Sequence, residues 1–305
     1  MMNSFKDILE VAKQGRFKKL VVPRPVAADL PLLADASAAG LISPCFVGDG
    51  KTLRAMISGS PLAAGKYELM EENNPQQVLG RALAAVRNGA GDILMQGGVA
   101  PQELLDALSD KEQGLLPKGG IISLVSVFPL LKREKLILVT DTFINNHPTL
   151  VEKQQILTNA LQLACILGIE TPKTAVLAAI EQVNPGIPST LDAAILSKMA
   201  ERRQFGKAIV EGPLDIDCAL SQVAAQRKGL QSVVTGNVDI YLVPEIDTGH
   251  LLAEALVFFG RMQTAGVVMG TAKPVILNLP FVSDENRIVE IALAGLLSGK
   301  GGSNG

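Results

Sequence analysis

The stretch Leu136-Ile-Leu-Val-Thr140 leads through a polar loop into the helical pattern of Leu150–Leu167, and another apolar run follows at Ala175–Ile180. The first run is apolar at successive positions rather than at alternate ones, as a strand buried on both faces requires. A buried strand, a helix and a second buried strand in this order favour a parallel pair covered by the helix. The stretch therefore predicts an α/β fold.

The same alternation of short apolar runs and helical patterns extends in both directions from this stretch. Further strands are expected at Leu20–Pro23, Ser43–Val47, Tyr67–Glu71, Ile93–Gln96, Ile121–Phe128, Ala208–Val210, Ile240–Val243 and Gly266–Leu277. Helical patterns such as Gln76–Asn88 and Gln102–Ser109 lie between them. With 305 residues, of which 48% are hydrophobic, the chain is long enough for two domains, each with a largely parallel sheet flanked by helices.

Composition excludes several classes of partner. The formal net charge is −2, whereas nucleic-acid-binding domains are usually basic, so we expect no DNA or RNA partner. No apolar run reaches the roughly 18 residues that span a bilayer, and the start Met1–Asp7 lacks the apolar segment of a secretory signal. We therefore expect a cytoplasmic protein without a membrane partner.

Metal and thiol chemistry are not indicated by the sequence. Cys45, Cys165 and Cys218 are scattered, and each lies in an apolar stretch, so we expect buried free thiols. No cysteine pair has metal-ligand spacing, and only His147 and His250 could add imidazole ligands. The sequence predicts no metal site.

A run of motifs in the C-terminal half carries a family resemblance. It contains Thr140-Asp141, Asn145-Asn-His-Pro148, Glu181-Gln-Val-Asn-Pro185, Pro188-Ser-Thr-Leu-Asp-Ala-Ala194 and Pro244-Glu-Ile-Asp-Thr-Gly249. In order and spacing this run resembles the phosphate acetyltransferase and phosphate butyryltransferase family, and in particular its butyryl branch. The resemblance extends from about Phe5 to Lys300, which is nearly the whole chain.

The resemblance implies an acyltransferase that converts acyl-CoA and phosphate to acyl phosphate and CoA. Coenzyme A is then a substrate, and no tightly bound cofactor is expected. The implied fold is like that of isocitrate and isopropylmalate dehydrogenases, with residues 1–140 plus 271–305 as a discontinuous first domain, 141–270 as the second, and the ligand cleft between them. The resemblance also implies a homodimer formed through the second domain, although the apolar stretch Leu251–Phe259 taken alone is more often core than interface.

Polar groups that the family's chemistry uses are replaced in this chain. The family's Ser-Arg-x-Asp stretch after the last strand falls on Leu279, Pro280 and Val282. Other family arginines fall on Asp106 and Leu116, a family histidine on Leu124, and a family lysine on Gln96. Since arginine matches phosphate oxygens bidentately, this pattern predicts impaired phosphate use. The alternative is a catalytically altered CoA or acyl-CoA binding protein of the same fold.

Seven residues are expected to bind substrate or CoA: Asp141, Asn145, Thr190, Lys198, Gly249, His250 and Asn278. Local roles remain open for several of them. Asp141 has an equal chance of tethering its own loop. Capping a helix is the default role of Thr190, and a lysine on an amphipathic helix, such as Lys198, is more often simply solvated. No catalytic residue is identified; Ser283 and Asn286 are candidates, and helix capping is the default role of Ser283.

Overall fold

A computed structural model describes residues 1–130 and 133–300, and its internal contacts divide them into two units. Unit 1 comprises Met1–Ser4 and Ile121–Thr264, and unit 2 comprises Phe5–Gly120 and the chain from Ala265 onward. These units differ from the ranges expected from the sequence at residues 1–4, 121–140 and 265–270, and residues 301–305 lie outside the described part. Residues 121–140 go with unit 1 because β5 (Ser123–Leu130) and β6 (Lys135–Thr140) pair as an antiparallel hairpin.

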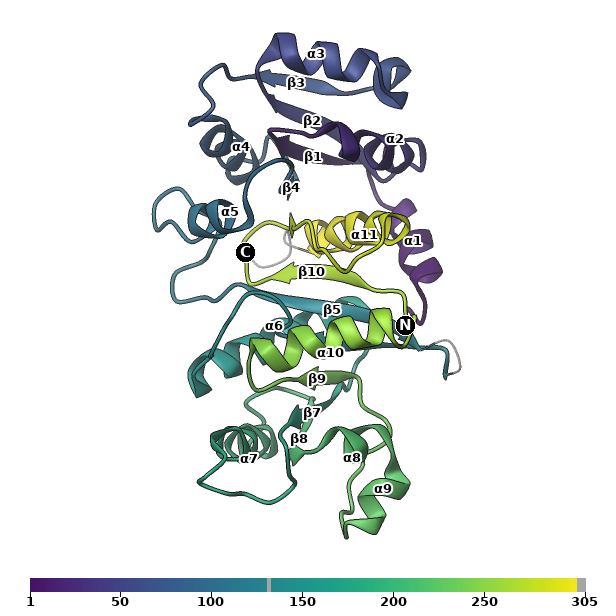
Figure 1. Ribbon diagram of the computed structural model, residues 1–305, viewed down its shortest axis with the longest axis vertical. Coiled ribbons are helices and arrows are strands. Elements are labelled where there is room, and N and C mark those ends of the chain that lie inside the picture. The colour runs from purple at the N-terminus through teal and green to yellow at the C-terminus, as the bar shows by residue number, and fades with distance from the viewer. Residues whose placement is uncertain (131–132, 301–305) are drawn as a thin grey trace. The chain divides into compact units, whose positions relative to one another are not determined.

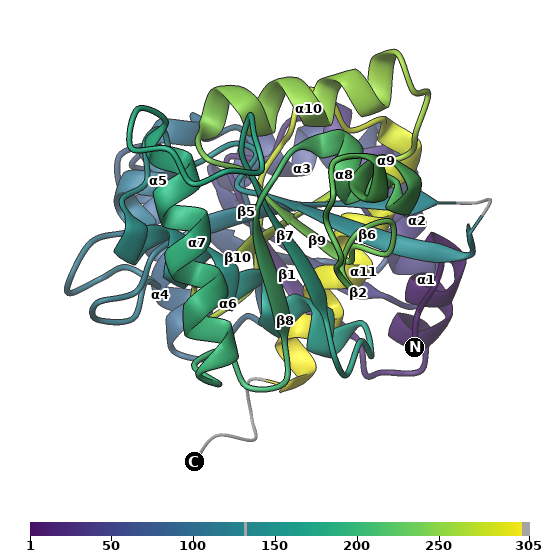
Figure 2. The same cartoon turned by 90° about the horizontal axis from the view of Figure 1, so that it is seen from below.

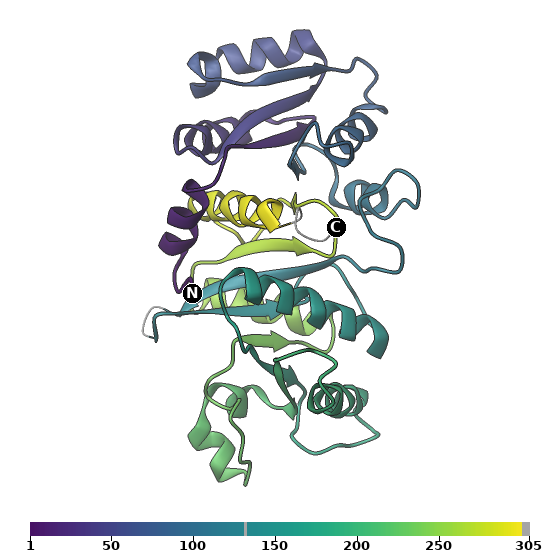
Figure 3. The same ribbon diagram turned by 180° about the vertical axis from the view of Figure 1, so that it is seen from behind.

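Unit 2 contains a five-stranded parallel sheet in the order β11-β4-β1-β2-β3. Its strands are β1 (Lys18–Pro23), β2 (Ile42–Gly48), β3 (Glu68–Glu71), β4 (Ile93–Met95) and β11 (Val275–Ile276). The helices are α1 (Phe5–Lys13), α2 (Leu30–Ala38), α3 (Gly50–Ser58), α4 (Val78–Arg87), α5 (Pro101–Leu108) and α11 (Asp284–Lys300). Figures 1 and 3 show α4 and α2 on opposite sides of β1 and β2, which explains why these strands are buried at every residue but the second.

Unit 1 contributes strands in the order β5-β6-β9-β7-β8, and all pairs after the β5–β6 hairpin are parallel. The remaining strands are β7 (Lys173–Leu177), β8 (Ile209–Leu214) and β9 (Ile240–Leu242). The helices are α6 (Leu150–Ile166), α7 (Pro188–Glu201), α8 (Ile216–Leu220), α9 (Gln222–Arg227) and α10 (Ile246–Phe258). Figure 2 shows α6 and α7 on one side of β7 and β8, with α8 on the other.

One expected strand is broken in the structure. The apolar run Gly266–Leu277 forms β10 (Ala265–Met269) and then β11, rather than a single strand. Gly270 has a φ of 93°, a left-handed conformation that glycine tolerates, and Pro274 lacks the N–H that a central strand donates. The sequence carried a signal for this turn, because Gly270, Thr271, Lys273 and Pro274 interrupt the apolar run.

Cysteine burial is only partly as expected. Cys45 and Cys218 are buried, but Cys165 is exposed, so the expectation of three buried thiols was wrong. Cys165 lies on α6 next to the buried Ala164, and successive helical residues point to different faces. Within residues 1–130 and 133–300, no helix combines the length and apolarity that crossing a bilayer demands.

Candidate functional site

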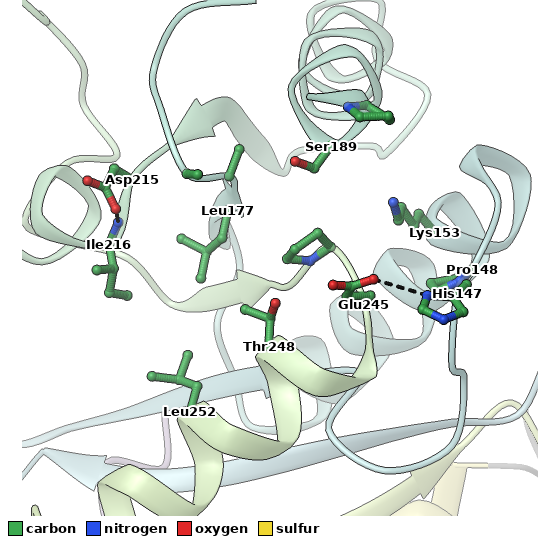
Figure 4. Close-up of a pocket in the computed structure, with 14 residues that line it drawn as sticks. His147, Pro148, Lys153, Leu177, Ser189, Asp215, Ile216, Glu245, Thr248 and Leu252 are labelled. Atoms are coloured by element: carbon green, nitrogen blue, oxygen red, sulfur yellow. Dashed lines mark hydrogen bonds and ion pairs between the residues drawn. The ribbon is translucent and has the colours of Figure 1, made fainter. Parts of the chain in front are cut away.

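A cavity of about 630 Å³ opens in unit 1, where four strands end. Strands β6, β7, β8 and β9 run parallel, so their carboxyl ends meet at the same edge of the sheet. The cavity is lined by His147, Pro148, Lys153, Leu177, Ala178, Ala179, Pro188, Ser189, Asp215, Ile216, Pro244, Glu245, Thr248 and Leu252 (Figure 4). Ligands of α/β proteins bind at this edge of a parallel sheet, which makes the cavity the candidate site.

Three long helices begin at this cavity. Pro148 immediately precedes the N-cap of α6, Pro188 is the first residue of α7, and Thr248 lies in the first turn of α10. The N-cap of α6 is satisfied by a capping box, whereas α7 and α10 have no side-chain hydrogen bond at their N-caps. Free N–H groups and the helix dipole give these ends partial positive charge, which favours an anionic ligand group.

Charged side chains at the cavity are mostly paired with one another. Lys153 is 9% exposed, and its Nζ lies 2.7 Å from Oδ2 of Asp192. The Nδ1 of His147 lies 3.0 Å from Oε2 of Glu245, in an exposed pair visible in Figure 4. Since the carboxylate of Asp192 offsets the charge of Lys153, the cavity offers apolar surface, hydroxyl groups and helix ends rather than a dense positive field.

An acidic cluster beside Asp215 surrounds a lysine. Glu181, Asp217 and Cys218 present ligand atoms within 4.8 Å of one another, but Nζ of Lys228 lies 2.6 Å from Glu181 and 2.9 Å from Asp217. Lys228 also lies 3.2 Å from Asp215. Burial, followed by hydrogen bonds with neighbouring carboxylates, raises the pKa of Cys218 to about 12. The cluster therefore already holds a cation, and its thiol is not a nucleophile near neutral pH.

Asp141 is committed to its own loop. Its carboxylate accepts hydrogen bonds from the backbone N–H groups of Leu124 (3.2 Å), Phe143 (2.9 Å), Ile144 (3.1 Å) and Asn145 (3.1 Å). The Nδ2 of Asn145 donates to the same carboxylate and to the carbonyl of Ile122, 2.8 Å away. Burial raises the pKa of Asp141, and these hydrogen bonds oppose the rise. Of the two alternatives for Asp141, the geometry favours the loop tether.

Gly249 and His250 pack against the same loop from α10. A Cβ on Gly249 would lie 2.2 Å from the carbonyl oxygen of Asp141, so only glycine allows this approach of helix and loop. The Nδ1 of His250 lies 3.2 Å from the carbonyl of Thr142, and its Nε2 lies 3.4 Å from Glu254. The structure thus brings together Asp141, Asn145, Gly249 and His250, but as a packed support and not as lining of the cavity.

Thr190 and Lys198 lie at opposite ends of α7. Thr190 is buried beside the cavity-lining Ser189, and its hydroxyl is bonded to the backbone of Asn184 (2.9 and 3.0 Å) and of Ile187 (2.8 Å), so it fixes the loop before α7. Lys198 follows eight residues later, roughly 12 Å along the helix at 1.5 Å per residue. It is exposed and paired with Glu201, which favours the solvated alternative.

Unit 2 has a polar network at the carboxyl ends of its strands. Asn278 follows β11; its N–H donates to Gln96 Oε1 at 2.9 Å, and its Nδ2 donates to the carbonyl of Gly97 at 3.0 Å. The Nη2 of Arg287 donates to Asn278 Oδ1 at 2.7 Å and to Asp29 Oδ1 at 3.0 Å. Asp29 is only 2% exposed, and its Oδ2 has no partner within the described residues.

The segment that replaces the family's Ser-Arg-x-Asp pattern is part of the core. Leu279 is 7% exposed and Val282 8%, whereas Pro280 is exposed. Ser283 is exposed, and its carbonyl accepts the N–H of the buried Asn286, as expected at the start of α11. Apolar packing therefore occupies positions where the family resemblance implies polar groups.

Sequence reasoning missed most residues that line the cavity. His147, Lys153, Ser189, Asp215, Glu245 and Thr248 line it, yet none was among the seven expected binding residues. Each of them lies in the segment after a parallel strand or in the first turns of the helix that follows. That position was the available signal. Asp141 and Asn145 also follow a strand, and they were selected because they match a family motif at its end.

Comparisons with known proteins agree with this architecture. A model of the family described as Phosphate acetyl/butaryl transferase matches residues 64–294. Phosphate butyryltransferase of Clostridium acetobutylicum is 36% identical over 302 residues, covering 98% of this chain and 99% of that protein.

Solved structures are also similar to this chain. A branched-chain phosphotransacylase from Enterococcus faecalis V583 matches with a TM-score of 0.78 and 25% identity, covering 92% of this chain and 99% of its own. A phosphotransacetylase from Streptococcus pyogenes, at 19% identity and a TM-score of 0.79 over 95% of this chain and 99% of its own, shares the fold. The α/β fold with two largely parallel sheets, expected from the sequence, is confirmed.

Proposed function

We propose that the chain, which belongs to the phosphate acetyl/butaryl transferase family, transfers acyl groups from coenzyme A to phosphate and binds phosphate weakly. In this reaction a phosphate oxygen attacks the thioester carbonyl carbon, the C–S bond breaks, and CoA leaves as the thiolate. The acyl phosphate retains the acyl group. Two binding tasks follow: holding acyl-CoA and holding the phosphate.

The burial of Leu279 and Val282 is the observation that carries the proposal of weak phosphate use. These side chains stand where the resemblance implies Ser and Asp, and Pro280 stands where it implies Arg. A charge-assisted hydrogen bond contributes about 1.5–3 kcal/mol, so two missing arginines weaken phosphate binding by roughly two to four orders of magnitude. Such a loss slows transfer without removing the acyl-CoA site.

The cavity of unit 1 supports the acyl-CoA half of the proposal. Its apolar wall, formed by Leu177, Ile216 and Leu252, suits an acyl chain or the pantetheine arm. The uncapped starts of α7 and α10 suit anionic or carbonyl oxygens. Both features lie within unit 1, at the strand ends where the fold class binds ligands.

A coupled assay with acetyl-, butyryl- and isobutyryl-CoA, with and without phosphate, tests the proposal. We expect phosphate-dependent release of CoA that does not saturate at millimolar phosphate. Saturation at micromolar phosphate with a turnover of about 1–1000 per second would contradict weak phosphate use.

The second candidate function is a CoA or acyl-CoA binding protein without transfer activity, which the buried Leu279 and Val282 also favour. Calorimetry distinguishes the two functions. Binding of butyryl-CoA with no CoA release at any phosphate concentration would favour the binding protein. If the chain neither binds butyryl-CoA nor releases CoA, both functions are contradicted.

A homodimer is proposed as the assembly. Leu251, Phe258 and Phe259 on and after α10 are 66%, 63% and 91% exposed, so this apolar stretch is not covered within the described chain. We expect sedimentation at micromolar concentration to give the mass of a dimer. The mass of a monomer would contradict the proposed homodimer.

A further inference from the structure

We propose that a small pocket in unit 2 binds a short aliphatic monocarboxylate, with the carboxylate held by the ammonium group of Lys18. The pocket has a volume of about 240 Å³. It shares no lining residue with the cavity of unit 1, and the site is independent of the proposed acyl transfer.

The pocket lies between α1 and α11, at the amino ends of two strands. The two helices pack against each other (Figures 1 and 3). Lys18 is the first residue of β1, and Leu41 immediately precedes β2. Because the strands of this sheet are parallel, Asn278 and the other residues that follow strands lie at the opposite edge. The pocket is therefore away from the edge where α/β proteins usually bind their substrates.

Apolar and small residues form the walls of the pocket. Val11 comes from α1, Leu41 from the start of β2, and Ile291 from α11. Gly295 lies one turn after Ile291 on the same face of α11, and it leaves the space that a side chain would occupy. A Cβ built on Gly295 would meet Cγ of Lys18 at 3.9 Å, so the stem of Lys18 lies beside this glycine. Such walls suit an aliphatic chain.

The charge of the pocket is positive. Among the described residues that line it, the charged ones are Arg16 and Lys18. Arg16 is 77% exposed, and its Nη2 lies 3.2 Å from Oδ1 of Asp92, so this cation already has a partner. Lys18 is 7% exposed, and across residues 1–130 and 133–300 its side chain forms no ion pair or hydrogen bond. One unpaired ammonium matches one carboxylate, whereas a phosphate group would need more donors than the pocket supplies.

A comparison with Lys153 shows what Lys18 lacks. Both lysines are 7% exposed. The Nζ of Lys153 lies 2.7 Å from Oδ2 of Asp192, whereas the described chain places no carboxylate against Lys18. The Nζ of Lys18 is not among the fully enclosed polar atoms without a partner, so water reaches it. Burying a charge without a partner is unfavourable, and a carboxylate that enters the pocket supplies the partner.

The volume of the pocket limits the length of the ligand. A volume of 240 Å³ is about eight times the roughly 30 Å³ that one water molecule takes up in the liquid. The pocket therefore holds about eight non-hydrogen atoms, which is the size of hexanoate. It lies below the roughly 300–1,000 Å³ of pockets for drug-sized ligands, so a molecule as large as coenzyme A does not fit.

Calorimetry of the full chain with hexanoate tests the inference. Wild type should bind hexanoate with a Kd of about 1 mM or lower, an ordinary free energy per atom for a ligand of this size. Each methylene removed should weaken binding about fourfold, so butyrate should bind about 16-fold more weakly. Hexylamine, with the same chain and the opposite charge, should not bind. Absence of hexanoate binding at about 10 mM, or equal affinities for hexanoate and hexylamine, would overturn the inference.

Substitution of Lys18 tests the contact with the carboxylate. Lys18→Gln should weaken hexanoate binding about 10- to 100-fold, because a charge-assisted hydrogen bond is lost. The matched control Lys19→Gln changes the next residue of β1, which does not line the pocket and whose Nζ lies 2.8 Å from Glu68. Its affinity for hexanoate should equal that of wild type. Equal affinities in the two variants would contradict the proposed site.

Filling the pocket gives a second test that keeps Lys18 in place. Gly295→Leu should abolish hexanoate binding, whereas Gly80→Leu, at an exposed glycine of α4 with open space around it, should leave binding unchanged. Melting temperatures of both variants verify that they fold. Thr248→Trp, which narrows the cavity of unit 1, should also leave hexanoate binding unchanged. Binding that survives Gly295→Leu, or that is lost in Thr248→Trp, would place the ligand elsewhere and refute the site.

Discussion

The two units differ in what lies at the carboxyl ends of their parallel strands. In unit 1 the ends of β6 to β9 border a cavity of about 630 Å³, and two uncapped helix starts face it. In unit 2 the end of β11 runs into Asn278 and then the buried Leu279, Phe281 and Val282. The difference teaches that topology selects the edge where ligands bind, but the side chains after each strand decide whether that edge is open or filled.

The cations at the two edges are alike in being paired. Lys153 in unit 1 is paired with Asp192 beside the cavity. Arg287 in unit 2 is paired with the buried Asp29 and also donates to Asn278. The two edges therefore differ in the space that their side chains leave for a ligand, and not in whether the cation is paired. The predictions below are ordered from the largest expected effect to the smallest.

Reopening the filled edge should have the largest effect. Leu279→Ser, Pro280→Arg and Val282→Asp, combined with Asp106→Arg, restore the groups that the resemblance implies. Two arginine contacts should raise kcat/KM for phosphate by about two orders of magnitude or more. The matched control carries Pro280→Gln and Asp106→Gln in the same background. Equal gains in both proteins would show that polarity, and not arginine, was limiting.

Glu290 should make the filled edge sensitive to pH. Burial raises its pKa from 4.5 to about 8, so between these values the folded state keeps a proton that the unfolded state releases. The contribution of Glu290 to the free energy of unfolding should therefore be highest below pH 4.5. It should fall by about 1.4 kcal/mol per pH unit up to pH 8 and stay constant at higher pH.

Glu290→Gln removes this titration and leaves an acceptor for the N–H of Gly266, which lies 2.8 Å from Oε1 in the wild type. Denaturant unfolding at pH 5 and pH 8 measures the difference between the two proteins. A variant whose stability falls with pH as steeply as wild type would show that Glu290 is ionised in the folded state.

Filling the cavity of unit 1 should weaken CoA binding about tenfold or more. Thr248→Trp places an indole at a residue that lines the cavity, whereas Asp247→Trp places the same group at an exposed neighbour that does not. A tenfold weakening corresponds to about 1.4 kcal/mol. Calorimetry with CoA should detect it for Thr248→Trp alone; equal affinities for the two variants would place CoA elsewhere.

Removing Lys198 should have the smallest effect. Its ammonium is exposed and paired with Glu201 at the far end of α7, so Lys198→Ala should change the Kd for CoA by less than about twofold. Glu201→Ala is the control, since it frees the lysine without removing it. A tenfold loss in Lys198→Ala alone would restore Lys198 as a CoA contact.

The family resemblance was available from the sequence because it depends on motif order, which needs no coordinates, and the comparisons confirm it. The α/β class was available for a related reason: helical and strand periodicities are local, and a continuous apolar strand signals burial on both faces. The roles of Asp141 and Thr190 were left between alternatives, since a polar side chain in a loop can bond to its own backbone or to a ligand.

What the sequence determined by itself was the order of elements and the edge of each sheet where polar residues follow strands. What only the tertiary structure decided was which of those residues meet. Arg287 and Asp29 are separated by 258 positions, and Lys153 and Asp192 by 39. No local pattern encodes such pairs, because a side chain's partner depends on how strands and helices pack. The same packing enclosed Leu279 and Val282 and left the cavity between the helix starts open.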